Sequence, residues 1–251
     1  MLVGKGISFD TGGISIKSNA GMRDMKTDMA GAAVVLAAVD AAARLRLPTP
    51  VTAVALLAEN TVSGSSYRPG DVVRHVGGRT TEVGNTDAEG RMVLADGLAY
   101  ARLHLAATAL VDLATLTAAT RIALGSRTAG LYSTAEGLSG ALRTAAGHAG
   151  EGVWPMPLGE EHVGHLRAEL DSLVADAGND PGGPGGITAA LFLQPFAGDV
   201  PWAHLDMSGP SRAPKDDVEV VKGGTAFGVR TLLRWLEAGA PVELPEEIVL
   251  D

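Results

Sequence analysis

Two glycine-punctuated segments carry most of the residues whose types and spacing could do chemistry. The first is GKGISFDTGGISIK with its continuation MKTDMAGA, and the second is NTDAEGR. The charged residues of interest in them are four carboxylates, two of the lysines and one arginine: Asp10, Asp28, Asp87, Glu89, Lys5, Lys17 and Arg91. Clustered carboxylates repel one another unless a cation lies between them. Oxygen ligands suit Mg²⁺, Mn²⁺ or carboxylate-bound Zn²⁺, so the residues predict a carboxylate metal site.

The spacing inside these segments leaves other readings open. Asp87, Glu89 and Arg91 alternate, so in an extended strand all three would point to one side, but they could equally form a surface ion-pair cluster. Asp28 could cap a helix, and Asp10 could close an Asx turn. The two lysines, Lys5 and Lys17, could simply be solvated.

Several other kinds of chemistry are excluded by the composition. The chain of 251 residues has no cysteine, which removes disulfides, thiolate nucleophiles and iron–sulfur ligation. Its six histidines form no HExxH pair, and neither a GxSxG elbow nor a GxxxxGK[ST] loop occurs. The net charge of −9, without a basic cluster, argues against nucleic-acid partners. No apolar run is long enough to span a membrane, so we expect a cytoplasmic protein with no membrane partner.

Short apolar runs alternate with longer stretches that have helical spacing. The predicted strands cover residues 2–9, 51–58, 109–111 and 203–207, and the predicted helices cover 29–47, 92–105, 138–147, 160–173, 187–196 and 225–236. This alternation predicts an α/β fold with a largely parallel central sheet flanked by helices. In such a sheet, sites form at the carboxyl ends of the strands. We expect one domain over residues 1–251.

The two segments together resemble the leucine aminopeptidase family, the cytosolic two-metal peptidases that act as hexamers. Matches to the family continue in order through DLATLT, ITAALF, WAHLD and GVRTLL, so the likeness extends from Leu2 to about Leu236. The resemblance implies the family's catalytic domain without its N-terminal domain. It also implies a homo-oligomer, by analogy a hexamer.

By position, the resemblance implies a two-metal site and a function. The implied ligands are Lys5, Asp10, Asp28, Asp87 and Glu89, with Asp10 and Glu89 bridging the ions. Mn²⁺ or Zn²⁺ fits best, and Mg²⁺ or Co²⁺ is also compatible. Lys17 would polarise the substrate carbonyl, and Arg91 would hold a bicarbonate that acts as general base. The implied substrate-binding residues are Met25, Thr115 and Leu116. The expected activity is metal-dependent release of leucine-like N-terminal residues from peptides.

Two other functions stay open at this point. The chain could be a non-catalytic oligomerising or binding fragment of the same fold. It could also be another carboxylate-bridged two-metal hydrolase, for example one that acts on phosphate esters, although the acidic charge and the absence of a phosphate-binding loop argue against this.

Overall fold

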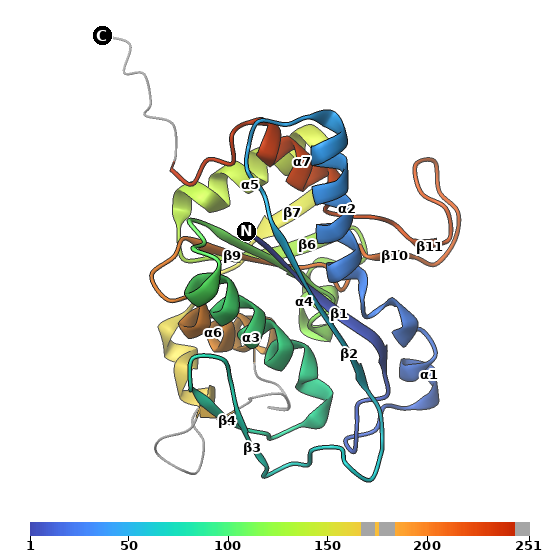
Figure 1. Ribbon diagram of the computed structural model, residues 1–251. Helices are drawn as coiled ribbons and strands as arrows, with labels where there is room; N and C mark the ends of the chain where they lie inside the picture. The colour runs from blue at the N-terminus through green and yellow to red at the C-terminus, as the bar shows by residue number, and fades with distance from the viewer. Residues whose placement is uncertain (167–173, 176–183, 244–251) are drawn as a thin grey trace.

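A six-stranded sheet forms the centre of the computed structural model, which describes residues 1–166, 174–175 and 184–243 (Figure 1). The strand order is β2 (Ala53–Asn60), β1 (Leu2–Asp10), β5 (Leu110–Ala114), β9 (Trp202–Asp206), β6 (Thr128–Ser133) and β7 (Gly152–Pro155). The first four strands are parallel, β6 runs antiparallel to β9, and β7 is parallel to β6. The predicted α/β fold with a largely parallel sheet is confirmed.

Helices cover both faces of this sheet (Figure 1). One face packs against α2 (Ala30–Leu45), α5 (Glu136–Ala149) and α7 (Val229–Glu237), and the other packs against α3 (Glu89–His104) and α6 (Gly185–Ala197). Successive strand residues point to opposite faces, so Leu2 and Val3 enter different hydrophobic clusters. This explains why the central strands are apolar throughout.

Shorter elements connect these layers. They are α1 (Asn19–Met22), α4 (Ala118–Leu124), the 3₁₀ turns Met25–Thr27, Thr86–Ala88 and Glu160–Leu166, the sheet of β3 (Val72–Arg74), β4 (Thr80–Glu82) and β8 (Val174–Ala175), and the hairpin of β10 (Arg212–Ala213) and β11 (Gly223–Gly224). The prediction of an α-helix over 160–173 is wrong for its first half, which is 3₁₀. Its second half, 167–173, lies outside the described residues. Strands β6 and β7 were not predicted.

Helix α2 approaches the sheet unusually closely because its second residue is glycine. A Cβ atom on Gly31 would lie 2.0 Å from the carbonyl oxygen of Leu113 on β5. No larger residue fits between the helix and the sheet. Gly31 therefore fixes the helix start, and with it the turn that carries Asp28, directly over β1 and β5.

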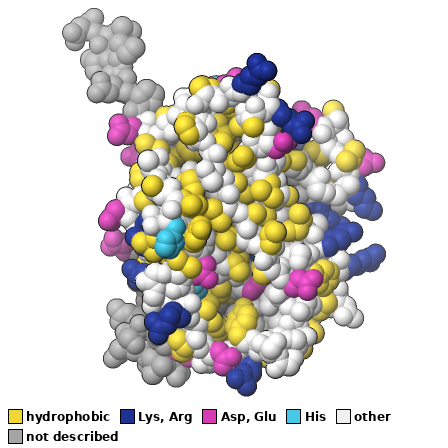
Figure 2. All heavy atoms as spheres, in the orientation of Figure 1, with side chains coloured by type: hydrophobic (Ala, Val, Ile, Leu, Met, Phe, Trp, Pro, Cys, Tyr) yellow, Lys and Arg dark blue, Asp and Glu magenta, His cyan; other side chains and the backbone are white. Residues whose placement is uncertain are grey.

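Strand β2 lies at the edge of the sheet and leaves apolar surface exposed. Leu57 on β2, Leu36 on α2 and Leu103 on α3 are all exposed, and Figure 2 shows hydrophobic side chains gathered over this face of the molecule. Among the described residues, no helix combines the length and apolar character needed to cross a membrane.

Candidate metal centre

The carboxyl ends of the four parallel strands meet at one edge of the sheet, and each carries a polar residue there. Asp10 at the end of β1 is the register partner of Asn60 at the end of β2. Asp206 ends β9, next to the end of β5, and Thr115 follows β5 directly. Parallel topology therefore gathers residues that are up to 196 positions apart in sequence (206 minus 10). This is the edge where α/β sheets place their sites.

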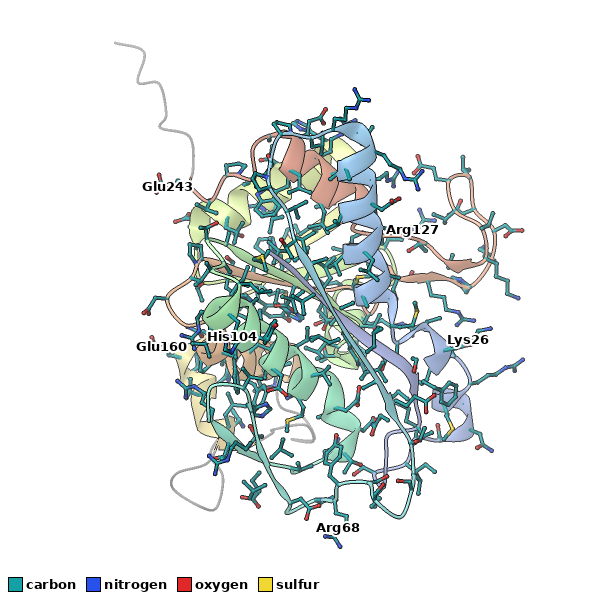
Figure 3. The ribbon with its side chains drawn as sticks, viewed as in Figure 1. Lys26, Arg68, His104, Arg127, Glu160 and Glu243 are labelled. Carbon is teal, nitrogen blue, oxygen red and sulfur yellow. The ribbon has the colours of Figure 1, made fainter. Side chains whose placement is uncertain are left out.

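Lys5 lies buried beneath this edge, with only 3% of its surface exposed. Its Nζ lies 2.9 Å from Asp28 Oδ2 and 2.9 Å from Glu89 Oε1, and it donates to the carbonyl oxygen of Thr115 at 3.2 Å. The Thr115 hydroxyl in turn donates to Asp28 Oδ1 at 2.7 Å. Surface cations such as Lys26 and Arg127 point outward instead (Figure 3). The reading of Lys5 as a solvated lysine is therefore wrong.

Burial and charge act in opposite directions on the pKa values of Lys5 and Asp28. Burial works to lower the pKa of Lys5, but the negative charges of Glu89 and Asp28 outweigh it and leave the pKa raised. Burial raises the pKa of Asp28 to about 6, although Lys5 and the Thr115 hydrogen bond partly offset it. Among these carboxylates Lys5 is an ammonium, and it can act as a ligand only if it gives up its proton.

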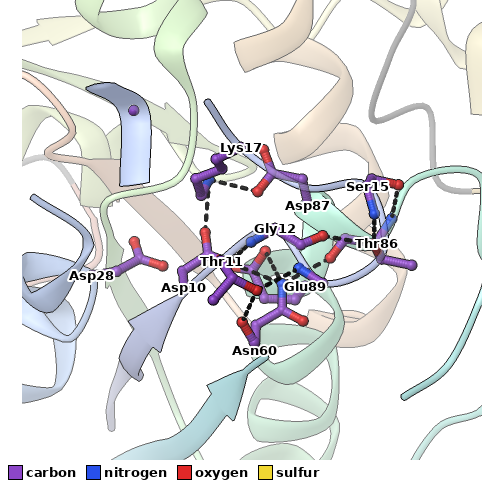
Figure 4. A network of polar contacts seen from close by, with 12 residues as sticks. Asp10, Thr11, Gly12, Ser15, Lys17, Asp28, Asn60, Thr86, Asp87 and Glu89 are labelled. Atoms are coloured by element: carbon purple, nitrogen blue, oxygen red, sulfur yellow. Dashed lines mark hydrogen bonds and ion pairs between the residues drawn. The ribbon is translucent and has the colours of Figure 1, made fainter. Parts of the chain in front are cut away.

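Lys17 occupies the outer side of the same cluster. Its Nζ lies 2.7 Å from Asp10 Oδ2 and 2.5 Å from Asp87 Oδ1, and its side chain is 17% exposed (Figure 4). Burial opposes its charge, yet the hydrogen bonds to Asp10 and Asp87 raise the pKa of Lys17. Burial also raises the pKa of the Asp87 carboxyl. Lys17 is thus a charged group at the mouth of the cluster.

The second sequence segment is not extended, so the alternation argument was wrong. Residues Thr86–Ala88 form a 3₁₀ turn and Glu89 begins α3. The turn still brings Asp87 and Glu89 close to Asp10. One carboxylate oxygen from each of the three residues lies within 4.8 Å of the other two. A 3₁₀ turn leading into a helix thus gathers the carboxylates that an extended strand was expected to gather. The interpretation as a surface ion-pair cluster is wrong for Glu89, because Glu89 is buried.

The local readings of the two other carboxylates have different outcomes. Asp28 does not cap α2: the residue preceding the helix is Met29, whose side chain makes no cap bond. The Asx turn at Asp10 is confirmed, because its Oδ1 accepts the backbone N–H of Gly12 at 2.8 Å. Asp10 therefore shapes its own turn with one oxygen while the other faces Lys17.

The charge and geometry of this centre fit divalent cations. Four carboxylates face two ammonium groups, 4 − 2 = 2 negative charges in excess, at side chains that are mostly buried. Asp28 Oδ2 and Asp87 Oδ1 are buried, and each faces a lysine ammonium, that of Lys5 and that of Lys17 respectively. Clustered carboxylate oxygens with surplus negative charge are the donors that hard and borderline metal ions take.

The remaining predicted residues surround this centre. Arg91 is buried on α3, two residues after Glu89. Met25 opens the 3₁₀ turn that leads to Asp28, and it is half-buried. Thr115 and Leu116 follow β5 and are also half-buried. Thr115 touches the Lys5–Asp28 pair, so the predicted substrate segment adjoins the predicted metal ligands.

Two residues at the strand ends had no predicted role. Asn60 donates to two of the carboxylates. Asp206 is fully buried and accepts from the N–H of Leu116, the N–H and hydroxyl of Thr117, and the N–H and hydroxyl of Ser208. Asp206 therefore holds the segment after β5 in place. A polar residue that directly ends an apolar strand was the sequence signal for both.

Comparison with known proteins gives a consistent family assignment. The model of the cytosol aminopeptidase family, catalytic domain, matches residues 1–233. Similar proteins include the probable cytosol aminopeptidase of Chlorobium luteolum, 49% identical over 94% of this chain and 46% of that protein, and that of Streptomyces coelicolor, 50% identical over 96% and 46%. The chain thus spans about half the length of these relatives.

A solved structure shows the same fold. The bottromycin maturation enzyme BotP, in complex with Mn, superposes with a TM-score of 0.89 and 44% sequence identity, over 94% of this chain and 52% of that one.

Proposed function

Because the chain belongs to the cytosol aminopeptidase family, we propose that it is a metal-dependent aminopeptidase that releases leucine-like N-terminal residues from peptides by a two-metal mechanism. One observation carries the proposal. Carboxylates from β1 and from the turn before α3 converge within 4.8 Å, with a charged lysine at the mouth of the cluster. Such a centre fits hydrolysis better than binding alone, because a binding surface has no need to bury like charges together.

The proposed ligands are Lys5, Asp10, Asp28, Asp87 and Glu89. Four carboxylates would balance two divalent ions, and the charge of an ion beside Nζ would favour the neutral amine of Lys5 over the ammonium. Bound ions of this kind supply activated water at neutral pH and polarise carbonyl oxygens. We propose Mn²⁺ or Zn²⁺, with Mg²⁺ and Co²⁺ as weaker candidates. The manganese in the BotP complex supports Mn²⁺ as the first choice for assays.

Residues of the chain would stabilise the carbonyl oxygen, hold the general base and bind the first side chain of the substrate. Lys17 stays charged and is partly exposed, so its ammonium can donate to the oxygen of the scissile carbonyl as negative charge develops there. The guanidinium of Arg91 has the planar fork that binds a planar anion with two hydrogen bonds, which supports a bicarbonate acting as general base. Met25, Thr115 and Leu116 would form the pocket for the first side chain.

The proposed assembly and cellular location also rest on analogy with the family. We propose a homo-oligomer, a hexamer by analogy, that works in the cytoplasm on peptides without nucleic-acid or membrane partners. The cytosolic names of the relatives support the location. The exposed apolar edge at β2 supports assembly with further protein.

A substrate panel tests the proposed reaction. The Mn²⁺-supplemented chain is given leucyl p-nitroanilide, its N-acetylated form and p-nitrophenyl phosphate. We expect cleavage of the leucyl amide alone, because an aminopeptidase needs the free amino group. Faster cleavage of the phosphate ester would favour the alternative two-metal hydrolase. A folded, Mn²⁺-binding chain that cleaves nothing would favour the non-catalytic fragment.

A further inference from the structure

Asn60 connects the segments that carry the carboxylates. It is the last residue of β2 and only 6% exposed. Its Nδ2 donates to Asp10 Oδ1 at 2.9 Å, to the carbonyl oxygen of Thr86 at 2.9 Å and to Glu89 Oε2 at 3.3 Å (Figure 4). One amide group thus reaches the end of β1, the 3₁₀ turn that carries Asp87, and the first residue of α3.

The orientation of this amide follows from its partners. All three partners are acceptors: two carboxylates and a carbonyl. Only the NH₂ side of an asparagine can donate to them, so a flipped amide would set its oxygen against three oxygens. The group offers two hydrogens to three acceptors, and both hydrogens are therefore used inside the cluster.

The backbone places Asn60 for this contact. Strand β1 has an irregularity between Ile7 and Phe9, after which Asp10 and Asn60 become register partners. The extra residue, Ser8, donates its hydroxyl to the carbonyl oxygen of Ala58 at 3.2 Å and so ties the irregularity to β2. Irregularities of this kind redirect side chains near functional sites. Beyond the strands, the carbonyl oxygen of Asn60 accepts the N–H and hydroxyl of Thr11.

In both Asp10 and Glu89, the two carboxylate oxygens have different kinds of partner. In Asp10, Oδ1 accepts from Asn60 and the Gly12 N–H, while Oδ2 faces Lys17. In Glu89, Oε2 accepts from Asn60, while Oε1 faces Lys5. Each carboxylate therefore has one oxygen held by a neutral donor and one directed at a cation. A neutral donor shared by both opposes their mutual repulsion without adding charge to the site.

We propose that Asn60 is a positioning residue that fixes Asp10 and Glu89 relative to each other and so sets the affinity of the centre for divalent metal. The proposal rests on the proposed function, because it takes these two carboxylates as ligands. Hydrogen-bond partners of metal ligands typically change metal affinity by about 10–100-fold when they are removed.

The test compares two variants that touch the same carbonyl. Asn60→Ala removes the donor to Asp10, Glu89 and Thr86. Tyr67→Phe is the matched control, because the Tyr67 hydroxyl donates to the same Thr86 oxygen at 3.3 Å and, among the hydrogen bonds described, makes none to Asp10 or Glu89. Mn²⁺ binding is measured by calorimetry and by the electron paramagnetic resonance of free Mn²⁺, on protein shown by circular dichroism to be folded.

We expect Asn60→Ala to weaken Mn²⁺ binding by about 10–100-fold and Tyr67→Phe to stay within about twofold of wild type. If Asn60→Ala does not fold, Asn60→Ser serves in its place, because a hydroxyl has one hydrogen and cannot serve both carboxylates. Wild-type Mn²⁺ affinity in a folded Asn60 variant would overturn the positioning role and leave the proposed function intact. A wild-type chain that binds no Mn²⁺ would instead overturn the proposed function itself, and the positioning role with it.

Discussion

Replacing Gly90 with alanine should disturb the metal centre through a single methyl group. A Cβ atom at position 90 would lie 2.6 Å from both Cε and Nζ of Lys5 and 2.8 Å from its Cδ. Lys5 has little room to yield, because it is 3% exposed and its Nζ contacts Asp28 and Glu89 at 2.9 Å each. Moving Nζ from 2.6 Å to a tolerable 3.4 Å requires a shift of about 0.8 Å.

Two opposing effects set the expected magnitude. Overpacking a filled site costs about 1–3 kcal/mol, whereas alanine is favoured over glycine in a helix by up to about 1 kcal/mol. The net loss in unfolding free energy for Gly90→Ala is therefore only about 0–2 kcal/mol. The loss of activity should be far larger, because a misplacement of about 1 Å at a reacting site can cost about a hundredfold.

The assay compares Gly90→Ala with Gly147→Ala, the same substitution in helix α5. Gly147 is exposed, and a Cβ there would meet nothing within 4 Å. We expect Gly147→Ala to raise the melting temperature by about 2–4 °C at unchanged activity. Gly90→Ala should lose leucyl amide hydrolysis and Mn²⁺ affinity while staying folded. A Gly90→Ala variant within twofold of wild type in both would refute the role assigned to Lys5.

Three further changes give distinct readouts. Lys17→Met should lower kcat by about 10²–10³-fold, because it removes the donor to the carbonyl oxygen. It should not weaken Mn²⁺ binding, because Lys17 competes with cations for Asp10 Oδ2. A loss of metal affinity with kcat retained would contradict this prediction. Asp206→Asn should raise KM for the leucyl amide more than it changes kcat, because the asparagine amide cannot accept every hydrogen bond that now holds Leu116 in place. The same loss should lower the unfolding free energy by about 1–3 kcal/mol. An unchanged KM would contradict this prediction. In chelator, the folded pKa of Asp28, about 6, lies above its unfolded value of 3.8, so its stabilisation is complete below the unfolded pKa and is lost as the pH rises through about 6. The difference in unfolding free energy between wild type and Asp28→Asn should therefore fall by about 2 kcal/mol from about pH 4 to about pH 7.5. Urea unfolding that shows no such fall would refute the burial argument.

The sequence alone predicts the layered fold because local and global signals agree there. Strands β1, β2, β5 and β9 are apolar runs bounded by turns, and α2, α3, α5 and α6 have regular spacing. The weaker elements were missed for physical reasons. Strand β7 has only four residues, of which two are exposed, so tertiary pairing with β6 rather than propensity makes it a strand.

The residue types of the metal centre could be predicted, but their geometry could not. Lys5 looks like any surface lysine until the topology places it between Asp28 and Glu89. The spacing of Asp87 and Glu89 suggested a strand, whereas a 3₁₀ turn leading into α3 brings them together. The sequence marks Asn60 only as a polar residue at the end of an apolar strand, because its role depends on the strand register with Asp10, which emerges only in the folded sheet.

The central claim is that these carboxylates hold the metal ions that make the chain an aminopeptidase. The most direct measurement is a titration of Mn²⁺ into chelator-treated chain while leucyl p-nitroanilide hydrolysis is followed. The account predicts no turnover at the start and a rate that rises until about two ions per chain are bound. A rate that is already full in chelator, or a folded chain that stays inactive at saturating Mn²⁺, would contradict it.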